Sequence, residues 1–249
     1  MNGSIGGTAW SIGKIVAALL IAAGIAGGGW LIGRGLLEAR SSDRFVSVKG
    51  LAERDVKADL ALWPLRFVAT GNDLQVAKAK IAADEAAIRK FVTGAGVPDS
   101  AIEVVGFEVT DLLAQVYRSG PVESRFVLAA TLIVRSNDVD RIAALAQKVG
   151  DLVDAGVVLS TEGAPSGPVF LFTALNDAKP EMVAEATRNA REAAQEFARD
   201  SGSQLGGIRR ASQGVFQILS RDEAPGIQEP YQVNKRLRVV STVDYYLTD

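Results

Sequence analysis

The longest apolar stretch of the chain is an uncharged run of 19 residues between Lys14 and Arg34. A helix needs about 20 predominantly apolar residues to span a bilayer. A soluble helix of this length normally carries a polar stripe, and this run has none. We therefore predict an N-terminal tail at 1–13 and a transmembrane anchor at 14–37, with residues 15–33 in contact with membrane lipid.

A cleaved secretory leader is the alternative interpretation of this segment. Gly24-Ile25-Ala26 has the small-x-small pattern at which leaders are cut. However, the apolar run continues past this site through Trp30, Leu31 and Ile32, and the uncharged tail before Lys14 is long for a leader. Both observations favour an anchor that is retained.

Glycines recur along the predicted anchor at a spacing of four residues. The pairs are Gly24 with Gly28 and Gly29 with Gly33. Small residues at this spacing allow two helices to approach closely in lipid. The four glycines therefore predict a helix-packing surface, although glycine is also simply common in membrane helices.

Beyond a polar linker at 38–43, period-two alternation predicts strands and 3.6-residue periodicity predicts helices. Pro64, inside the second strand, indicates a bulge or a position at a sheet edge. Asn72 or Asp73 caps the first helix, and Gly94 and Gly96 end it. The predicted strands are 45–50, 56–69, 102–110, 126–135, 157–160, 169–173, 208–219 and 237–247, and the predicted helices are about 73–93, 139–149 and 179–200.

The order strand, helix, strand, long hairpin loop, strand occurs twice, over about 60–135 and about 169–247. We interpret this as an internal duplication of a β-α-β-β unit, although common elements can converge on the same order. The predicted fold class is α+β, with a transmembrane helix followed by one soluble domain at 44–249. Its helices lie on one face of antiparallel sheets.

The composition narrows the possible chemistry. The 249 residues include no histidine and no cysteine, which excludes Ser-His-Asp and Cys-His mechanisms, disulfides and thiolate metal sites. The net charge of −2 argues against a general nucleic-acid-binding protein. We find no converging acids. We therefore predict a non-enzymatic protein with no catalytic residue, metal site or cofactor.

The two long hairpin loops are the strongest candidates for an interface. Each carries a tyrosine beside a polar or rigid neighbour, in Tyr117-Arg118 and Pro230-Tyr231. Exposed aromatic residues with such neighbours are favoured at protein interfaces. The alternative is that each ring folds back over its own hairpin.

Two arginines near the C-terminus are candidates for anion binding. Arg236 and Arg238 alternate on one strand and therefore share a face. Such a face could form a cationic groove. The alternative is that the charges protect a sheet edge against aggregation.

The stretches VSVKGLAERDVKADLALWPLRF, AIEVVGFEV and KRLRVVSTVDYYL, with a long amphipathic helix after the first, resemble the SIMPL-domain family. The resemblance covers about residues 44–247 and rests on the order of elements and the character of the strands. It implies an α+β fold, a location outside the cytoplasm for bacterial members, a tendency to form homo-oligomers, and no established chemistry. Most secreted members have a clear cleavable leader, whereas this chain retains a predicted membrane helix.

Two functions remain open. The first is a self-assembling envelope protein that is anchored in the inner membrane by a single pass, has its domain in the periplasm and acts as a scaffold or interaction module. The second is an envelope protein that binds a small ligand or peptide in a cleft between the repeats. The positive-inside rule alone would place the domain in the cytoplasm, but long domains translocate largely regardless of charge.

Overall fold

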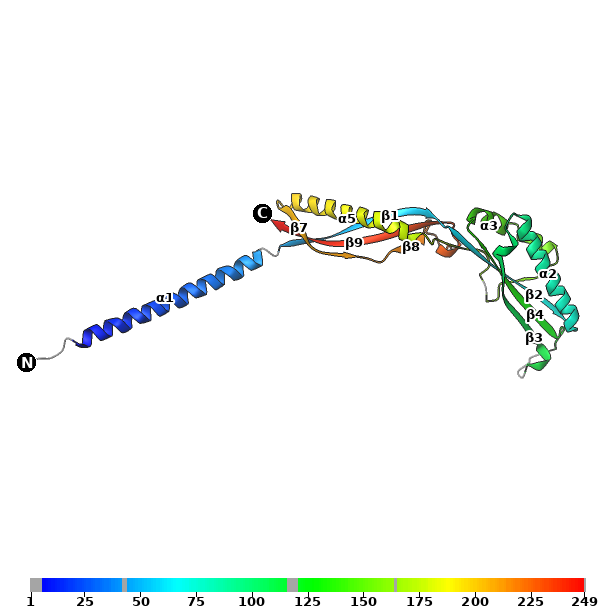
Figure 1. Ribbon diagram of the computed structural model, residues 1–249, viewed down its shortest axis with the longest axis horizontal. Coiled ribbons are helices and arrows are strands. Elements are labelled where there is room, and N and C mark those ends of the chain that lie inside the picture. The colour runs from blue at the N-terminus through cyan, green and yellow to red at the C-terminus, as the bar shows by residue number, and fades with distance from the viewer. Residues whose placement is uncertain (1–5, 42–43, 116–120, 164, 249) are drawn as a thin grey trace, which may run out of the picture. The chain divides into compact units, whose positions relative to one another are not determined.

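The computed structural model describes residues 6–41, 44–115, 121–163 and 165–248. Its N-terminal helix, α1 (Gly6–Ser41), extends beyond the predicted anchor at both ends (Figure 1). Within α1, the span Ala17–Gly35 is long and apolar enough to cross a membrane, and none of it is buried. A signal sequence near the N-terminus has the same length and composition. The N-terminal apolar helix is therefore a membrane anchor or a signal sequence.

The chain divides into two compact units. The first comprises Met1–Gly50, Thr187–Gln213 and Ser241–Asp249, and the second comprises Leu51–Ala186 and Gly214–Val240. Strands β1 (Phe45–Lys57) and β9 (Asn234–Thr248) and helix α5 (Leu175–Asp200) contribute residues to both units. The chain is thus an α+β protein with an N-terminal apolar helix and antiparallel sheets.

In the first unit, β9 lies between β1 and β7 (Gln204–Gln213). Helix α5 packs on one face of these strands, and its side chains there are small. Alanine recurs every four residues, at the buried positions 190, 194 and 198. Since residues four apart share a helix face, this spacing lets the helix approach the sheet closely. The buried cluster is Val46, Ala190, Ala194, Val243 and Tyr245.

The second unit contains a sheet in the order β3-β4-β2-β5, with β6 pairing to β2. Strand β4 pairs with β2 antiparallel and without a register shift, from Ala61 opposite Ser136 to Gly71 opposite Phe126. The strands are β2 (Leu60–Gly71), β3 (Ile102–Asp111), β4 (Phe126–Ser136), β5 (Leu159–Ser160) and β6 (Val169–Leu171).

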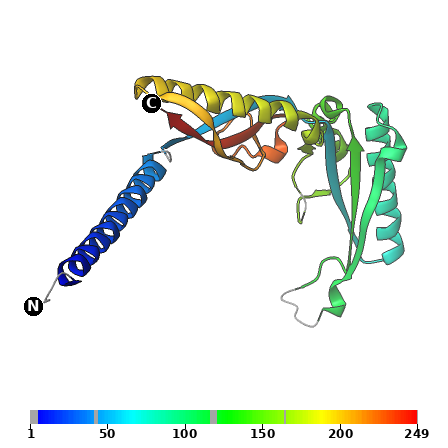
Figure 2. The same cartoon turned by 60° about the vertical axis from the view of Figure 1, so that its left-hand side comes forward.

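Helix α2 (Leu74–Gly94) packs on β2 and β4 and covers the main core (Figure 2). It begins at the N-cap Asp73, whose carboxylate accepts hydrogen bonds from the backbone N–H groups of Gln75 and Val76. Its buried apolar residues, Ala77, Ile81, Ile88 and Val92, are spaced along one face, as the sequence pattern predicts. The remaining helical elements before β6 are η1 (Asp99–Ala101), η2 (Leu112–Ala114), α3 (Val139–Ala146) and α4 (Gly150–Asp154).

A smaller cluster in the second unit involves β8 (Gln217–Ser220) and the N-terminal part of α5. Its buried members are Ala52, Met182, Ala186, Leu237 and Val239. A loop leads from β8 through the short helix η3 (Glu229–Tyr231) to β9. This cluster therefore includes residues from both strands that flank the predicted tyrosine-bearing loop.

Three predicted elements are interrupted in the structure. The strand predicted at 56–69 is interrupted, since β1 ends at Lys57 and β2 begins at Leu60. The carboxylate of Asp59 at this break accepts hydrogen bonds from the backbone N–H groups of Thr173 and Ala174. The strand predicted at 208–219 is divided into β7 and β8, and the helix predicted at 139–149 is divided into α3 and α4. In each case the local hydrophobic pattern continues through a break that a distant contact or a backbone turn imposes.

Pro64 occupies a local gap in the sheet. Its register with β4 is unshifted, so β2 has no bulge there. On the other side of β2, β6 pairs with residues 60–62 and β5 with residues 66–67. Val68 donates its backbone N–H to the carbonyl of Val158 on this side. Backbone N–H groups alternate in direction along a strand, so the nitrogen of residue 64 points to the same side as that of Val68. Proline is tolerated because no partner there needs its missing N–H.

The two predicted repeats share only part of their strand arrangement. In the first, β2, α2, β3 and β4 follow in order, and their strands adjoin as β3-β4-β2. In the second, α5 is followed by β7 and β9, but β6 pairs with β2, and β1 lies beside β9. The order helix, edge strand, inner strand therefore occurs twice. The internal duplication itself stays a prediction.

Candidate functional site

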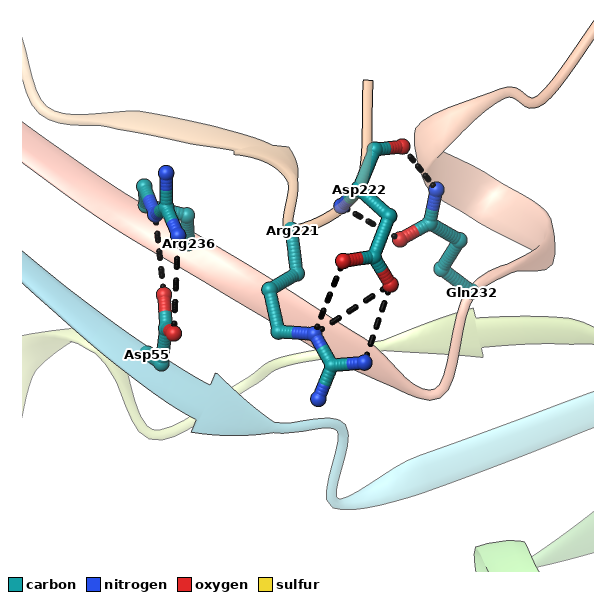
Figure 3. Close-up of polar contacts among 5 residues, drawn as sticks. All are labelled: Asp55, Arg221, Asp222, Gln232 and Arg236. Atoms are coloured by element: carbon teal, nitrogen blue, oxygen red, sulfur yellow. Dashed lines mark hydrogen bonds and ion pairs between the residues drawn. The ribbon is translucent and has the colours of Figure 1, made fainter. Parts of the chain in front are cut away.

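The loop between β8 and β9 is closed by a pair of hydrogen bonds at its base. Gln232 donates from Nε2 to the backbone carbonyl of Asp222 at 2.8 Å, and Asp222 donates its backbone N–H to Gln232 Oε1 at 3.3 Å (Figure 3). The Asp222 carboxylate also binds the guanidinium of Arg221. These contacts hold the two ends of the loop together and so define where η3 lies.

The buried side chain of Lys235 holds η3 in position. Its side chain is fully buried, and Nζ donates to the backbone carbonyl of Glu229 at 2.8 Å and forms an ion pair with the Glu229 carboxylate. A buried ammonium is costly unless it is paired and hydrogen-bonded, and here it is both. Since Glu229 is the first residue of η3, this contact positions Pro230 and Tyr231. The sequence analysis did not single out Lys235, because only the fold shows that it is buried.

Tyr231 lines a cavity of about 360 Å³. Phe170 and Val233 supply apolar surface, and Gln147 and Ser166 supply polar groups. The Tyr231 side chain is 45% exposed, so the ring is neither a core residue nor a fully free loop tip. The predicted aromatic residue therefore belongs to the wall of a cavity, which its position in the sequence did not indicate.

A second cavity of about 130 Å³ adjoins the first and shares Ala146, Ser166 and Gly167 with it. Arg66 on β2 lines it and binds Glu108 on β3, with Nη2 to Oε2 at 2.9 Å. This hydrogen bond holds the pKa of Glu108 below its usual range. Arg66 Nε is buried without a hydrogen-bond partner within the described ranges.

The predicted anion-binding residues share a face, but each is paired with an acid on β1. Arg236 Nε binds Asp55 Oδ1 at 2.9 Å (Figure 3), and Arg238 Nε lies 3.5 Å from Glu53 Oε1. The hydrogen bond from Arg236 holds the pKa of Asp55 below its usual range. Because the acids compensate much of the positive charge, this face offers less attraction to a free anion than the sequence suggested. Anion binding stays a prediction.

Of the predicted site residues that the structure describes, only Tyr231 is among those that line the cavity. Gly24, Gly28, Gly29 and Gly33 all lie in α1, where a Cβ at each would meet no neighbouring atom within 4 Å. Packing between anchors at these glycines stays a prediction. Tyr117 and Arg118 fall outside the described residues. Among the residues that are described, no group of three or more Asp and Glu side chains is placed to hold a metal ion.

Strand β3 exposes an apolar surface that sequence reasoning did not single out. Val104, Phe107 and Val109 lie on the side of the sheet that α2 covers, because they pair with the core residues Leu132, Ala130 and Leu128 of β4. Phe107 is nevertheless 54% exposed. Helix α2 packs on β2 and β4, and this edge strand projects beyond it. The alternation was visible in the sequence, but the lack of cover was not.

Comparison with known proteins identifies a family to which the chain is similar. The model of the SIMPL family, a protein family of unknown function (DUF541), matches residues 46–245. The chain belongs to the SIMPL family. The match runs from the start of β1 almost to the end of β9 and so spans the folded part of both units. No curated protein matches the chain. Because the function of the SIMPL family is not known, membership assigns no role to the cavity or to β3.

Proposed function

We propose that the protein is a membrane-anchored, non-enzymatic protein of the cell envelope that assembles with copies of itself and acts as a scaffold or interaction module. The observation that carries this proposal is the exposed apolar face of β3 at Val104, Phe107 and Val109. Contiguous exposed apolar surface on a soluble domain is a mark of a protein interface.

The N-terminal helix supports the proposal in two ways. The span Ala17–Gly35 exposes apolar side chains along its length, which is favourable in lipid. An anchor also confines the attached domains to a thin layer and raises their effective concentration. An interface that is weak in dilute solution can therefore form at the membrane.

Family membership supports a location in the envelope, because the resemblance noted in the sequence implies that bacterial members lie outside the cytoplasm. We place the anchor in the inner membrane and the domain in the periplasm. The chain has no cysteine, so Glu192→Cys on the exposed side of α5 gives a single labelling site. An impermeant thiol reagent should label this variant in intact cells as fully as in lysed cells. Labelling in lysed cells alone would show that the domain is cytoplasmic.

The absence of histidine and cysteine from the sequence supports a non-enzymatic role, since it removes the commonest general base and the strongest side-chain nucleophile. Self-assembly is tested by light scattering of the full-length protein in mild detergent. The proposal expects a defined mass above that of one chain. A strictly monomeric mass across the accessible concentrations would refute it.

The cavity beside Tyr231 favours a second candidate function, the binding of a small ligand or peptide. Its volume of about 360 Å³ and its mixture of apolar and polar groups are typical of ligand sites. A compound or peptide that binds there should raise the melting temperature of the full-length protein. The shift should be lost in Tyr231→Ala and kept in Glu192→Ala. A shift of equal size in both variants would place the binding elsewhere.

A further inference from the structure

Among the residues that the structure describes, two long edge strands have no other strand on their outer side. Strand β3 is terminal in the order β3-β4-β2-β5, and β7 is terminal in the order β1-β9-β7. Both strands are ten residues long. In β3 only Ile102 is buried, and in β7 no residue is. An open edge presents unpaired backbone N–H and C=O groups and is a template for another strand.

The remaining sheet edges are less suited to pairing. Strand β1 carries charged residues at five of its thirteen positions, a common protection of an edge against association. These are Lys49, Glu53, Arg54, Asp55 and Lys57. Strands β5, β6 and β8 have two, three and four residues, too few for a long pairing with another chain. Of the described edge strands, β3 and β7 are therefore the best suited to pair with a partner.

The charges of the two open edges are complementary. From Ile102 to Thr110, β3 carries Glu103 and Glu108 and no basic residue. Strand β7 carries Arg209 and Arg210 and no acidic residue. Charge complementarity of this kind selects one partner edge over another and fixes the register of the pairing.

The two sides of the strands also match. On β3, Glu108 faces away from α2, whereas Phe107 and Val109 face the side that α2 covers. On β7, Arg210 pairs with Asp244 on the side away from the core. Ile208 and Ala211 pair with the core residues Tyr245 and Val243, on the side that α5 covers.

We propose that β3 of one copy pairs antiparallel with β7 of a second copy of this chain, with the helices of both copies on the same side of the joined strands. An arrangement with Glu108 opposite Arg210 also places Phe107 opposite Ala211. The pairing of β7 with β9 already shifts register between Ile208 and Arg210, which leaves Arg209 as an extra residue. If Arg209 is also skipped in the pairing with β3, Val109 lies opposite Ile208. Polar residues then meet polar residues on one side, and apolar residues meet apolar residues on the other.

Glu108 can take part without giving up its existing contact. It binds Arg66 through Oε2, and its side chain is 64% exposed, so Oε1 can accept a hydrogen bond from Arg210 of the neighbouring copy. Each copy then uses a different edge toward each of two neighbours. Such a heterologous contact produces a ring where the rotation closes and a filament where it does not. This inference rests on the proposed self-assembly and names the surfaces that make it.

Cysteine pairing tests the contact directly, because the chain has no cysteine of its own. Full-length Phe107→Cys and Ala211→Cys are prepared separately, and both positions are exposed, so neither change should unfold the protein. Residues directly opposite each other on paired strands lie within disulfide distance. Mild oxidation of the mixed variants in detergent should therefore give a covalent dimer, and each variant alone should give none. The matched control is Phe107→Cys mixed with Arg191→Cys on the exposed side of α5, which should also give none.

Three other outcomes would contradict the proposed pairing, the proposed self-assembly, or both. No covalent dimer in the mixture, while wild type is oligomeric by light scattering, overturns this pairing and leaves self-assembly standing. A dimer of Phe107→Cys alone shows that β3 pairs with itself and also overturns the pairing with β7. A strictly monomeric wild type overturns both this inference and the proposed function.

Charge exchange provides a second measurement. Arg210→Glu and Glu108→Lys should each weaken association by about tenfold or more, because like charges then face each other. A mixture of the two variants should recover most of the loss, since each restores an opposite pair with the other. The control Arg191→Glu has the same change in charge and should associate as wild type does. If Arg210→Glu also associates as wild type does, the pairing is refuted.

Discussion

Lys235 Nζ donates a 2.8 Å hydrogen bond to the backbone carbonyl of Glu229 and forms an ion pair with the carboxylate of the same residue. The lysine is fully buried, whereas the Glu229 side chain is 32% exposed. The cost of leaving one partner unpaired therefore differs between the two residues. A stranded carboxylate at Glu229 can be hydrated, but a stranded ammonium at Lys235 cannot.

This asymmetry predicts that Glu229→Ala is more destabilising than Lys235→Met. Loss of the glutamate leaves a buried charge with one carbonyl partner, which should cost about 3 kcal/mol. Replacement of the lysine by an apolar chain of similar length should cost about 1 kcal/mol, mainly the lost hydrogen bond. Denaturant unfolding of the full-length protein in detergent measures both. Glu223→Ala, an exposed position on the same loop, is the control and should have little effect. Equal costs for the two pair variants would contradict the prediction.

The contact between Asp55 and Arg236 predicts a loss of stability in acid. The hydrogen bond from Arg236 lowers the pKa of Asp55 in the folded protein below the ordinary value of 3.8. A group with a depressed folded pKa contributes stability above its unfolded pKa and loses it as the pH falls through its folded pKa. The melting temperature should therefore fall as the pH drops below about 4. Asp55→Asn should show a weaker fall than wild type, and Asp154→Asn, on the exposed end of α4, should follow wild type.

A methyl group at Gly214 should destabilise the protein. A Cβ at this position would lie 2.8 Å from the backbone carbonyl oxygen of Val240, to which Gly214 also donates its N–H. Backbone atoms cannot move aside as a flexible side chain can, so Gly214→Ala should cost about 1–3 kcal/mol. Gly207→Ala is the matched control, because a Cβ there meets nothing within 4 Å. Thermal unfolding that ranks Gly207→Ala as the more damaging change would show that this contact is unimportant.

The N-terminal helix is predicted to remain on the mature protein. The apolar run continues beyond the possible cleavage site at Gly24-Ile25-Ala26, and residues 6–41 form one continuous helix through that site. Intact mass of the protein extracted from membranes should therefore correspond to an uncleaved chain. A mass that corresponds to a start near Gly27 would contradict this prediction and identify the segment as a leader.

The tyrosine-bearing loops are predicted to contribute to assembly. Replacement of both Tyr117 and Tyr231 by alanine should weaken self-association by about 2 kcal/mol or more, as expected for aromatic residues at the centre of an interface. The fold should persist, since Tyr231 is 45% exposed. Light scattering measures the association, and circular dichroism checks the fold. An oligomer of unchanged strength in the double variant would show that the loops have no such role.

Local patterns were sufficient for much of the architecture. The uncharged run, the spacing of Ala77, Ile81, Ile88 and Val92, and the capping residue Asp73 each act within a few turns of chain. The sequence therefore predicted α2 and the presence of an N-terminal apolar helix correctly, although α1 is longer at both ends than the predicted anchor. The α+β class and the family resemblance followed from the order of such elements. These features depend on neighbours in the sequence, and the sequence contains that information directly.

Only the tertiary structure decided the features that make up the candidate sites. Asp59 ends one strand and begins the next because its carboxylate binds the backbone N–H of Thr173, 114 residues away. Lys235 is buried, and Tyr231 lines a cavity, because distant segments close over them. The apolar face of β3 is exposed because α2 packs on β2 and β4 instead. Each of these features depends on how separate elements pack together, and no local periodicity records which elements will meet.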